Sequence, residues 1–163
     1  MNLDTLNSLT LPEFVNAVGW VFEHSPWVAE RAWPQRPFAT VDALHRAMAE
    51  QVDRASAEEQ LALLRAHPDL GTRARISDAS TAEQAGAGLD RLTPPEFDLL
   101  LRVNAEYRSK YGFPFLYAVK GSTKGDILKA LQERIRNSPE QEYREALRHV
   151  YRIARFRLEE SIS

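Results

Sequence analysis

The pentapeptide His67-Pro68-Asp69-Leu70-Gly71 interrupts a chain whose remaining sequence is rich in helix signals. Proline lacks an amide hydrogen and disfavours helical dihedral angles in the residue before it, and Gly71 permits a turn that other residues resist. We therefore expect a helix to end here and to present His67 on a stiff bend. Its imidazole ionises near neutral pH, which suits proton transfer. A capping role, in which His67 contacts the last carbonyls of the preceding helix, is the simpler interpretation of this stretch.

Helix-start signals surround the pentapeptide on both sides. The capping-box spacing, a Ser or Thr three residues before a Glu, occurs at four places: Thr10 and Glu13, Ser56 and Glu59, Ser80 and Glu83, and Thr93 and Glu96. Further starts are expected at Ser25, Thr40 and Ser138, and Gly121 and Ser122 are expected to precede another helix. The helix that follows Thr10 is expected to carry an apolar face as far as Phe22.

The pattern as a whole predicts an all-α protein. No stretch alternates apolar and polar residues between turn signals as a strand would. We expect one domain over residues 1–163, built as a single irregular bundle of about eight helices.

Composition excludes several classes of function. The formal charge of −2 gives no basic excess for nucleic-acid binding, and the absence of cysteine excludes disulfides, thiolate nucleophiles and cysteine-based metal sites. No apolar run approaches the ~18–20 residues of a membrane span, and the first residues lack the order of a signal peptide. We therefore expect a cytoplasmic protein with neither nucleic-acid nor membrane partners.

The terminal helix places an arginine on an apolar stripe. Tyr143, Leu147, Val150 and Ala154 follow helical spacing, and Arg157 continues the same line. Arginine in such a position needs an anionic partner. Its guanidinium could form a buried salt bridge to a protein carboxylate or extend from the helix end to solvent. Contact with an anionic ligand remains an equal alternative to these structural roles. The other charged residues of this helix are expected to form a solvated face: Arg144, Arg148, Arg152, Arg155, Glu140, Glu142, Glu145, Glu159 and Glu160.

Ser80, Glu83 and Gln84 form a second polar group. In the simpler interpretation Ser80 caps the helix, Glu83 returns the hydrogen bond and Gln84 points to water. In the functional alternative the helix start receives a polar ligand and Glu83 transfers a proton. Spacing alone favours capping.

The apolar stretch from Gly112 to Val119 is expected to be extended, because Pro114 prevents a helix from starting there. Its aromatic side chains could simply fill the core, or its backbone groups could line a pocket. His24, His45 and His149 show no ligand spacing with one another or with a nearby acid, so no metal site is expected.

Taken together in order, these motifs resemble a known family. They are His67-Pro-Asp-Leu-Gly71, Ser80-x-x-Glu83-Gln84, Ala87-Gly88-Leu89, Asn104-x-x-Tyr107, Lys110-Tyr-Gly-Phe-Pro-Phe-Leu116, Lys120-Gly121 and Arg152-Ile-Ala-x-x-Arg157-Leu158. Over essentially its whole length the chain resembles the 2-oxo-4-hydroxy-4-carboxy-5-ureidoimidazoline (OHCU) decarboxylases of urate degradation.

The resemblance implies an all-α homodimeric carboxy-lyase that needs no metal or organic cofactor and converts a small anionic ureidoimidazoline to (S)-allantoin. By position, His67 matches the essential proton donor and Glu83 the second catalytic residue. The positions matching substrate contacts are Pro68, Ser80, Gln84, Phe115, Leu116, Tyr117, Ala118, Val119 and Arg157. Arg73 or Arg75 could add positive charge to the site.

An alternative from another class is a non-enzymatic helical interaction module. Trp27, Trp33 and Phe115 would then dock a partner peptide from an exposed aromatic patch. Convergence of His67, Glu83 and Arg157 on one cavity would favour the enzyme instead.

Overall fold

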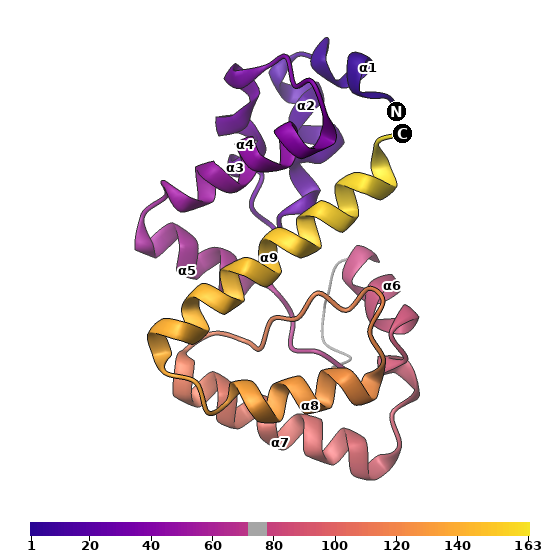
Figure 1. Cartoon of the computed structure of the whole chain (residues 1–163), viewed down its shortest axis with the longest axis vertical. Helices are drawn as coiled ribbons and strands as arrows, with labels where there is room; N and C mark the ends of the chain where they lie inside the picture. The colour runs from indigo at the N-terminus through magenta and orange to yellow at the C-terminus, as the bar shows by residue number, and fades with distance from the viewer. Residues whose placement is uncertain (72–77) are drawn as a thin grey trace. The chain divides into compact units, whose positions relative to one another are not determined.

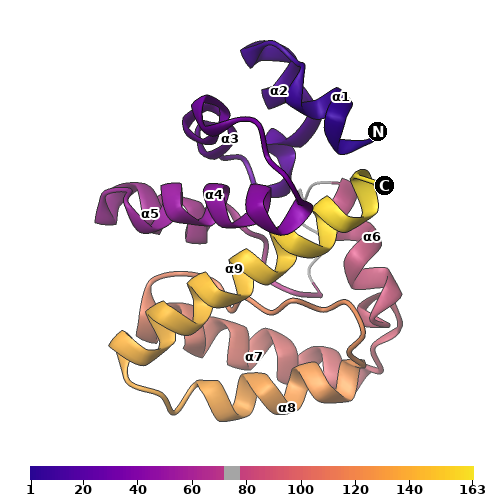
Figure 2. The same ribbon diagram turned by 45° about the horizontal axis from the view of Figure 1, so that its top comes forward.

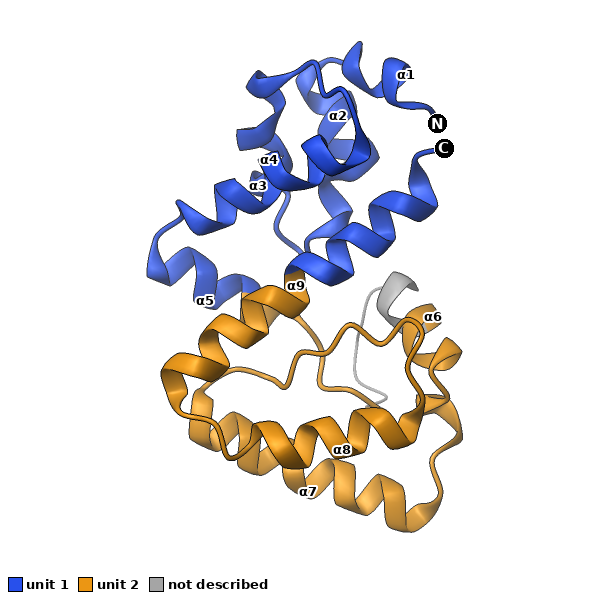
Figure 3. Ribbon diagram, in the orientation of Figure 1, with its two compact units in different colours: residues 1–63, 151–163 blue, residues 64–150 orange. Residues whose placement is uncertain are grey.

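The computed structural model describes the backbone of residues 1–71 and 78–163, and the side chains of residues 1–71 and 82–163 (Figure 1). The described chain forms two compact units, shown in different colours in Figure 3. Unit 1 contains Met1–Leu63 and Tyr151–Ser163, and unit 2 contains Leu64–Val150. That the chain acts as one domain stays a prediction.

The all-α prediction is confirmed: the described residues form α-helices and short 3-10 helices, and no strand occurs among them (Figure 2). The α-helices are α1 (Leu3–Asn7), α2 (Leu11–Val18), α3 (Trp27–Ala32), α4 (Val41–Asp53), α5 (Ala57–Ala66), α6 (Asp78–Gly86), α7 (Pro94–Tyr111), α8 (Lys124–Arg134) and α9 (Pro139–Ser161). The 3-10 helices are η1 (Gly19–Val21), η2 (Trp33–Gln35) and η3 (Leu89–Arg91). Within the described ranges, no helix is both long and apolar enough to cross a membrane.

Unit 1 confirms three of the expected helix starts and corrects two other expectations. One of the three is Ser56, whose hydroxyl accepts the amide hydrogen of Glu59 at the start of α5. The side chains of Thr10 and Thr40 cap α2 and α4. By contrast, α2 ends at Val18, because the chain tightens there into the 3-10 turn η1 before Phe22. Ser25 does not cap α3: its hydroxyl donates instead to the carbonyl of Glu23. The core of this unit contains fully buried apolar side chains, among them Leu6, Phe14, Phe22, Leu44 and Met48.

Unit 2 is built around α7, α8 and the first turns of α9. The capping box of Thr93 and Glu96 opens α7 as expected, and Thr123 with Asp126 opens α8. The expected capping box at Ser80 is wrong, because α6 already begins at Asp78 and places Ser80 inside the helix. Fully buried side chains of this unit include Leu64, Leu100, Tyr107, Phe115, Ile127 and Leu131.

The bend at residues 67–71 is held against α7. Helix α5 ends at Ala66, and Gly71 adopts a left-handed backbone conformation with φ of 76°. The side-chain amide of Asn104 donates to the carbonyl oxygen of Leu70 at 3.2 Å. Arg108 donates to the carboxylate of Asp69 at 3.0 Å. The predicted helix end is therefore confirmed, and two polar contacts from α7 fix the bend that follows it.

Replacing Gly71 by alanine is expected to destabilise the protein more than the same change at Gly88. Both glycines have positive φ, but a β-carbon at position 71 would overlap Cδ2 of Leu100, whereas nothing lies within 4 Å of one at position 88. G88A should cost about 1 kcal/mol of unfolding free energy from backbone strain. G71A should cost about 1–3 kcal/mol more, because Leu100 must move. Urea denaturation of both variants measures the difference, and equal losses would contradict this account.

Candidate active site

The bend and helix α6 bring four members of the predicted site into one local structure. His67 is buried, with 6% of its surface exposed, while Pro68 and Glu83 are half-buried. The side-chain oxygen of Gln84 accepts the amide hydrogen of Gly71 at 2.8 Å. The expectation that Gln84 points to water is wrong, because its side chain is 7% exposed and bonded to the bend. This bond ties the helix that carries Glu83 to the bend that carries His67.

The segment from Phe113 to Val119 is extended, as predicted, and contains no helix. The rings of Phe115 and Tyr117 stack with centroids 6.0 Å apart, because alternate residues of an extended chain lie on the same side. Phe115 is fully buried and Tyr117 half-buried. Figures 1 and 2 both draw this segment beside the bend that follows α5. The structure therefore places the backbone of this segment near the bend that carries His67.

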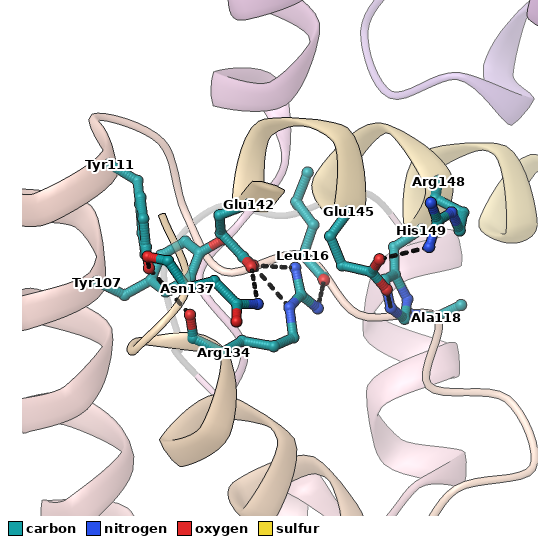
Figure 4. A network of polar contacts seen from close by, with 10 residues as sticks. All are labelled: Tyr107, Tyr111, Leu116, Ala118, Arg134, Asn137, Glu142, Glu145, Arg148 and His149. Atoms are coloured by element: carbon teal, nitrogen blue, oxygen red, sulfur yellow. Dashed lines mark hydrogen bonds and ion pairs between the residues drawn. The ribbon is translucent and has the colours of Figure 1, made fainter. Parts of the chain in front are cut away.

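Arg134, a buried arginine at the end of α8, binds the first part of the extended segment. One guanidinium nitrogen of Arg134 donates to the carbonyl oxygen of Leu116 at 2.6 Å, and Nε donates to the carboxylate of Glu142 at 2.6 Å (Figure 4). The same guanidinium lies 4.5 Å from the ring centroid of Phe115. A delocalised cation over an aromatic face is a favourable contact.

The carboxylate of Glu142 accepts hydrogen bonds from α7, from α8 and from the loop between α8 and α9. Besides Arg134, it accepts the hydroxyl hydrogen of Tyr107 at 2.6 Å and an amide hydrogen of Asn137 at 3.0 Å (Figure 4). Burial, and then the hydrogen bond to this carboxylate, raises the pKa of Tyr107 above its ordinary value. Tyr107 therefore acts as a donor here.

His149, a buried histidine of α9, binds the second part of the extended segment. The amide of Ala118 donates to Nδ1 of His149 at 3.0 Å, so the proton of the neutral imidazole lies on Nε2. Nε2 lies 3.3 Å from the carboxylate of Glu145. The imidazole also stacks on the ring of Tyr117, with centroids 5.0 Å apart.

Sequence reasoning missed this network. Glu142 was expected on a solvated face, but its side chain is 0% exposed. His149 was expected to lack a nearby acid, yet Glu145 lies one helical turn before it. The available signal was spacing: Glu142, Ala146 and His149 follow a second buried stripe of α9 beside the predicted one.

Arg157 lies in unit 1, where its guanidinium is buried and paired. It contacts the carboxylate of Glu23 at 3.0 Å, and the two side chains are 3% and 2% exposed. The carbonyl oxygens of Trp20 and Val21 accept from the same guanidinium at 3.4 and 3.3 Å. The salt-bridge alternative is thus confirmed, and contact with a ligand stays a prediction.

Three predicted residues fall outside the described side chains: Ser80, Arg73 and Arg75. Among the side chains that are described, no three His, Asp or Glu residues are grouped as a metal site would require.

The aromatic patch required by the interaction-module alternative is not formed by the predicted residues. Phe115 is fully buried. Trp33 is half-buried, its indole nitrogen donates to the carbonyl of Leu9 at 3.1 Å, and the guanidinium of Arg36 covers its ring at 3.9 Å. Trp27 is likewise half-buried beneath Arg31.

Comparison with known proteins gives the same family that the motifs resemble. A family model described as OHCU decarboxylase matches residues 7–159. A 2-oxo-4-hydroxy-4-carboxy-5-ureidoimidazoline decarboxylase of Halalkalicoccus jeotgali is 48% identical over 98% of this chain and 91% of that protein. One from Haloferax volcanii is 48% identical over 100% of this chain and 97% of that protein.

Solved structures agree in fold. A crystal structure of (S)-allantoin synthase matches with a TM-score of 0.80 and 33% identity, covering 99% of this chain and 54% of that chain. A crystal structure of OHCU decarboxylase in the presence of (S)-allantoin matches with a TM-score of 0.69 over 82% of this chain and 89% of that one. At 23% identity, this second match supports the fold alone.

Proposed function

We propose a function for this chain from one premise: it belongs to the OHCU decarboxylase family, whose model matches residues 7–159. It is a carboxy-lyase of urate degradation that converts 2-oxo-4-hydroxy-4-carboxy-5-ureidoimidazoline to (S)-allantoin and carbon dioxide. The observation that carries this function is 48% identity to decarboxylases of that name over nearly the whole of both chains.

The substrate itself supplies the electron sink. Its carboxylate lies on a carbon next to a ring C=N bond, an arrangement like that of a β-keto acid. When the bond to the carboxylate breaks, its electron pair forms a C=C bond, and the imine pair moves to the ring nitrogen, which takes up a proton. The resulting enol loses its hydroxyl proton and gains one at carbon to give allantoin. The protein therefore has to supply orientation, charge complementarity and a proton on one face.

His67 and Glu83 are proposed to handle these protons. His67 is held on a bend that two contacts from α7 fix, so its imidazole can engage the hydroxyl and carboxylate region with little loss of freedom. Glu83 lies next to Gln84, which is bonded to the same bend, and is proposed to assist tautomerisation so that protonation occurs on one face. Both assignments come from the family's motif, and this geometry supports them.

The remaining residues are proposed to bind the anion. Arg157 carries a permanent positive charge, which would offset the negative charge of the substrate carboxylate. The ion pair with Glu23 holds the guanidinium in place. Ser80, Gln84, Pro68 and the Phe115–Val119 segment are proposed to contact the ring and its urea group. Within this set, Gln84 also acts through the bend, since its oxygen is engaged by Gly71.

Replacing His67 by asparagine is expected to reduce turnover by on the order of 10²-fold, the usual loss when general acid–base catalysis is removed. His45→Asn is the matched control: this half-buried imidazole lies in unit 1 and bonds the carbonyl of Tyr151. Substrate is generated in situ from urate, and circular dichroism follows one-handed allantoin. Wild-type activity in H67N would remove His67 from the mechanism.

Replacing Glu83 by glutamine is expected to slow formation of optically active allantoin and to lower its enantiomeric excess. Glutamine keeps the size of the side chain but cannot accept a proton as a carboxylate does. Chiral chromatography of the product measures the excess. Glu58→Gln, an exposed change on α5, serves as the control. Unchanged rate and handedness in E83Q would exclude the proposed role.

We also propose that the protein is a cytoplasmic homodimer, as the family resemblance implies. Light scattering on the purified chain should then give twice its mass of 18.6 kDa. A mass of one chain across micromolar concentrations would reject the dimer while leaving the decarboxylase assignment intact.

A further inference from the structure

Arg134 and His149 contact the Phe115–Val119 segment in the same two ways. Each makes one hydrogen bond to the backbone, Arg134 to the carbonyl of Leu116 and His149 from the amide of Ala118. Each also covers one ring, that of Phe115 or Tyr117. We call Arg134 and His149 the two clamps. Each clamp is in turn held by a carboxylate of α9, at Glu142 or Glu145 (Figure 4).

The spacing of the clamps fixes which edge of the segment they occupy. In an extended chain the backbone groups of residues two apart point to the same side, and those between point to the opposite side. Leu116 and Ala118 therefore turn their bonded groups toward the clamps, and the amides of Tyr117 and Val119 face away. Within 115–119, the amide of Ala118 is the only one that donates to a group of the described chain.

A buried amide without an acceptor is costly. The described part of the chain provides no acceptor for the amides of Tyr117 and Val119, so these two amides call for an explanation. Val119 is 5% exposed and Tyr117 half-buried. Two amides on one edge suit a ligand with carboxylate or urea oxygens, since such oxygens accept hydrogen bonds. The substrate named by the proposed function has both kinds of oxygen.

We propose that His149 is a positioning residue: by accepting the Ala118 amide it holds the segment so that the amides of Tyr117 and Val119 are aimed at the substrate. The inference rests on the proposed function and adds to it a residue that acts without touching the substrate. His149 is expected to affect substrate binding, because the two amides donate to oxygens that the substrate already has before decarboxylation.

Two substitutions distinguish the effect of the hydrogen-bond acceptor of His149 from the effect of its aromatic ring. His149→Phe keeps an aromatic face against Tyr117 but removes the acceptor. His149→Asn keeps an oxygen near the position of Nδ1 but removes the ring. We expect H149F to raise KM about tenfold, with kcat within about threefold of wild type, and H149N to restore KM to within about threefold. Isothermal titration with (S)-allantoin should show the same order of affinities.

Matched controls and a second route keep the test decisive. H45F and H45N remove another histidine–backbone bond, in unit 1, and should leave KM unchanged. If H149F does not fold, Glu145→Leu replaces it: loss of the carboxylate beside Nε2 lets the proton move to Nδ1, so KM should again rise. An unchanged KM in the folded acceptor-deficient variant, or equal damage in H149N and H149F, overturns the inference. Absence of decarboxylation by the wild type is a separate result, which rejects the proposed function and the inference with it.

Discussion

The buried ion pair between Arg134 and Glu142 is the constraint on which the structure of unit 2 depends. Removing two charges from water costs several kcal/mol for each ion unless other groups replace the lost hydration. Here the hydroxyl of Tyr107 and the amide of Asn137 also donate to the carboxylate, and the carbonyl of Leu116 accepts a second hydrogen bond from the guanidinium. One charge pair thereby links α7, α8, α9 and the extended segment. A segment without secondary structure acquires a fixed path because the ion pair requires its carbonyl.

The helices were largely predictable from the sequence because their starts are local. Thr10, Thr93 and Ser56 each meet a glutamate three residues later, and the structure forms all three capping boxes. Helix ends at Gly112 and at the bend before Pro68 follow equally local rules. The failed prediction at Ser80 has a physical reason: the spacing specifies a possible cap, but α6 gains two further residues ahead of it.

The site was less predictable because its connections join residues far apart in the sequence. Glu142 reads as one more acid on a charged helix, and only the arrival of Arg134 and Tyr107 from other helices explains its burial. Gln84 reads as solvent-exposed until the amide of Gly71 is placed against it. Arg157 is the converse case, since its position on an apolar stripe did predict an anionic partner, which is Glu23. A stripe reveals burial, but the identity of a distant partner requires the fold.

The raised pKa of Tyr107 has a consequence for how the extended segment is anchored. A phenol that keeps its proton remains a donor throughout the neutral range, and a guanidinium never gives up its charge there. The hydrogen bond from Arg134 to the carbonyl oxygen of Leu116 is therefore unaffected by pH in the neutral range and by any proton released or consumed nearby. An enzyme that transfers protons at one edge of a peptide segment benefits when the opposite edge is held by groups that do not change their protonation state.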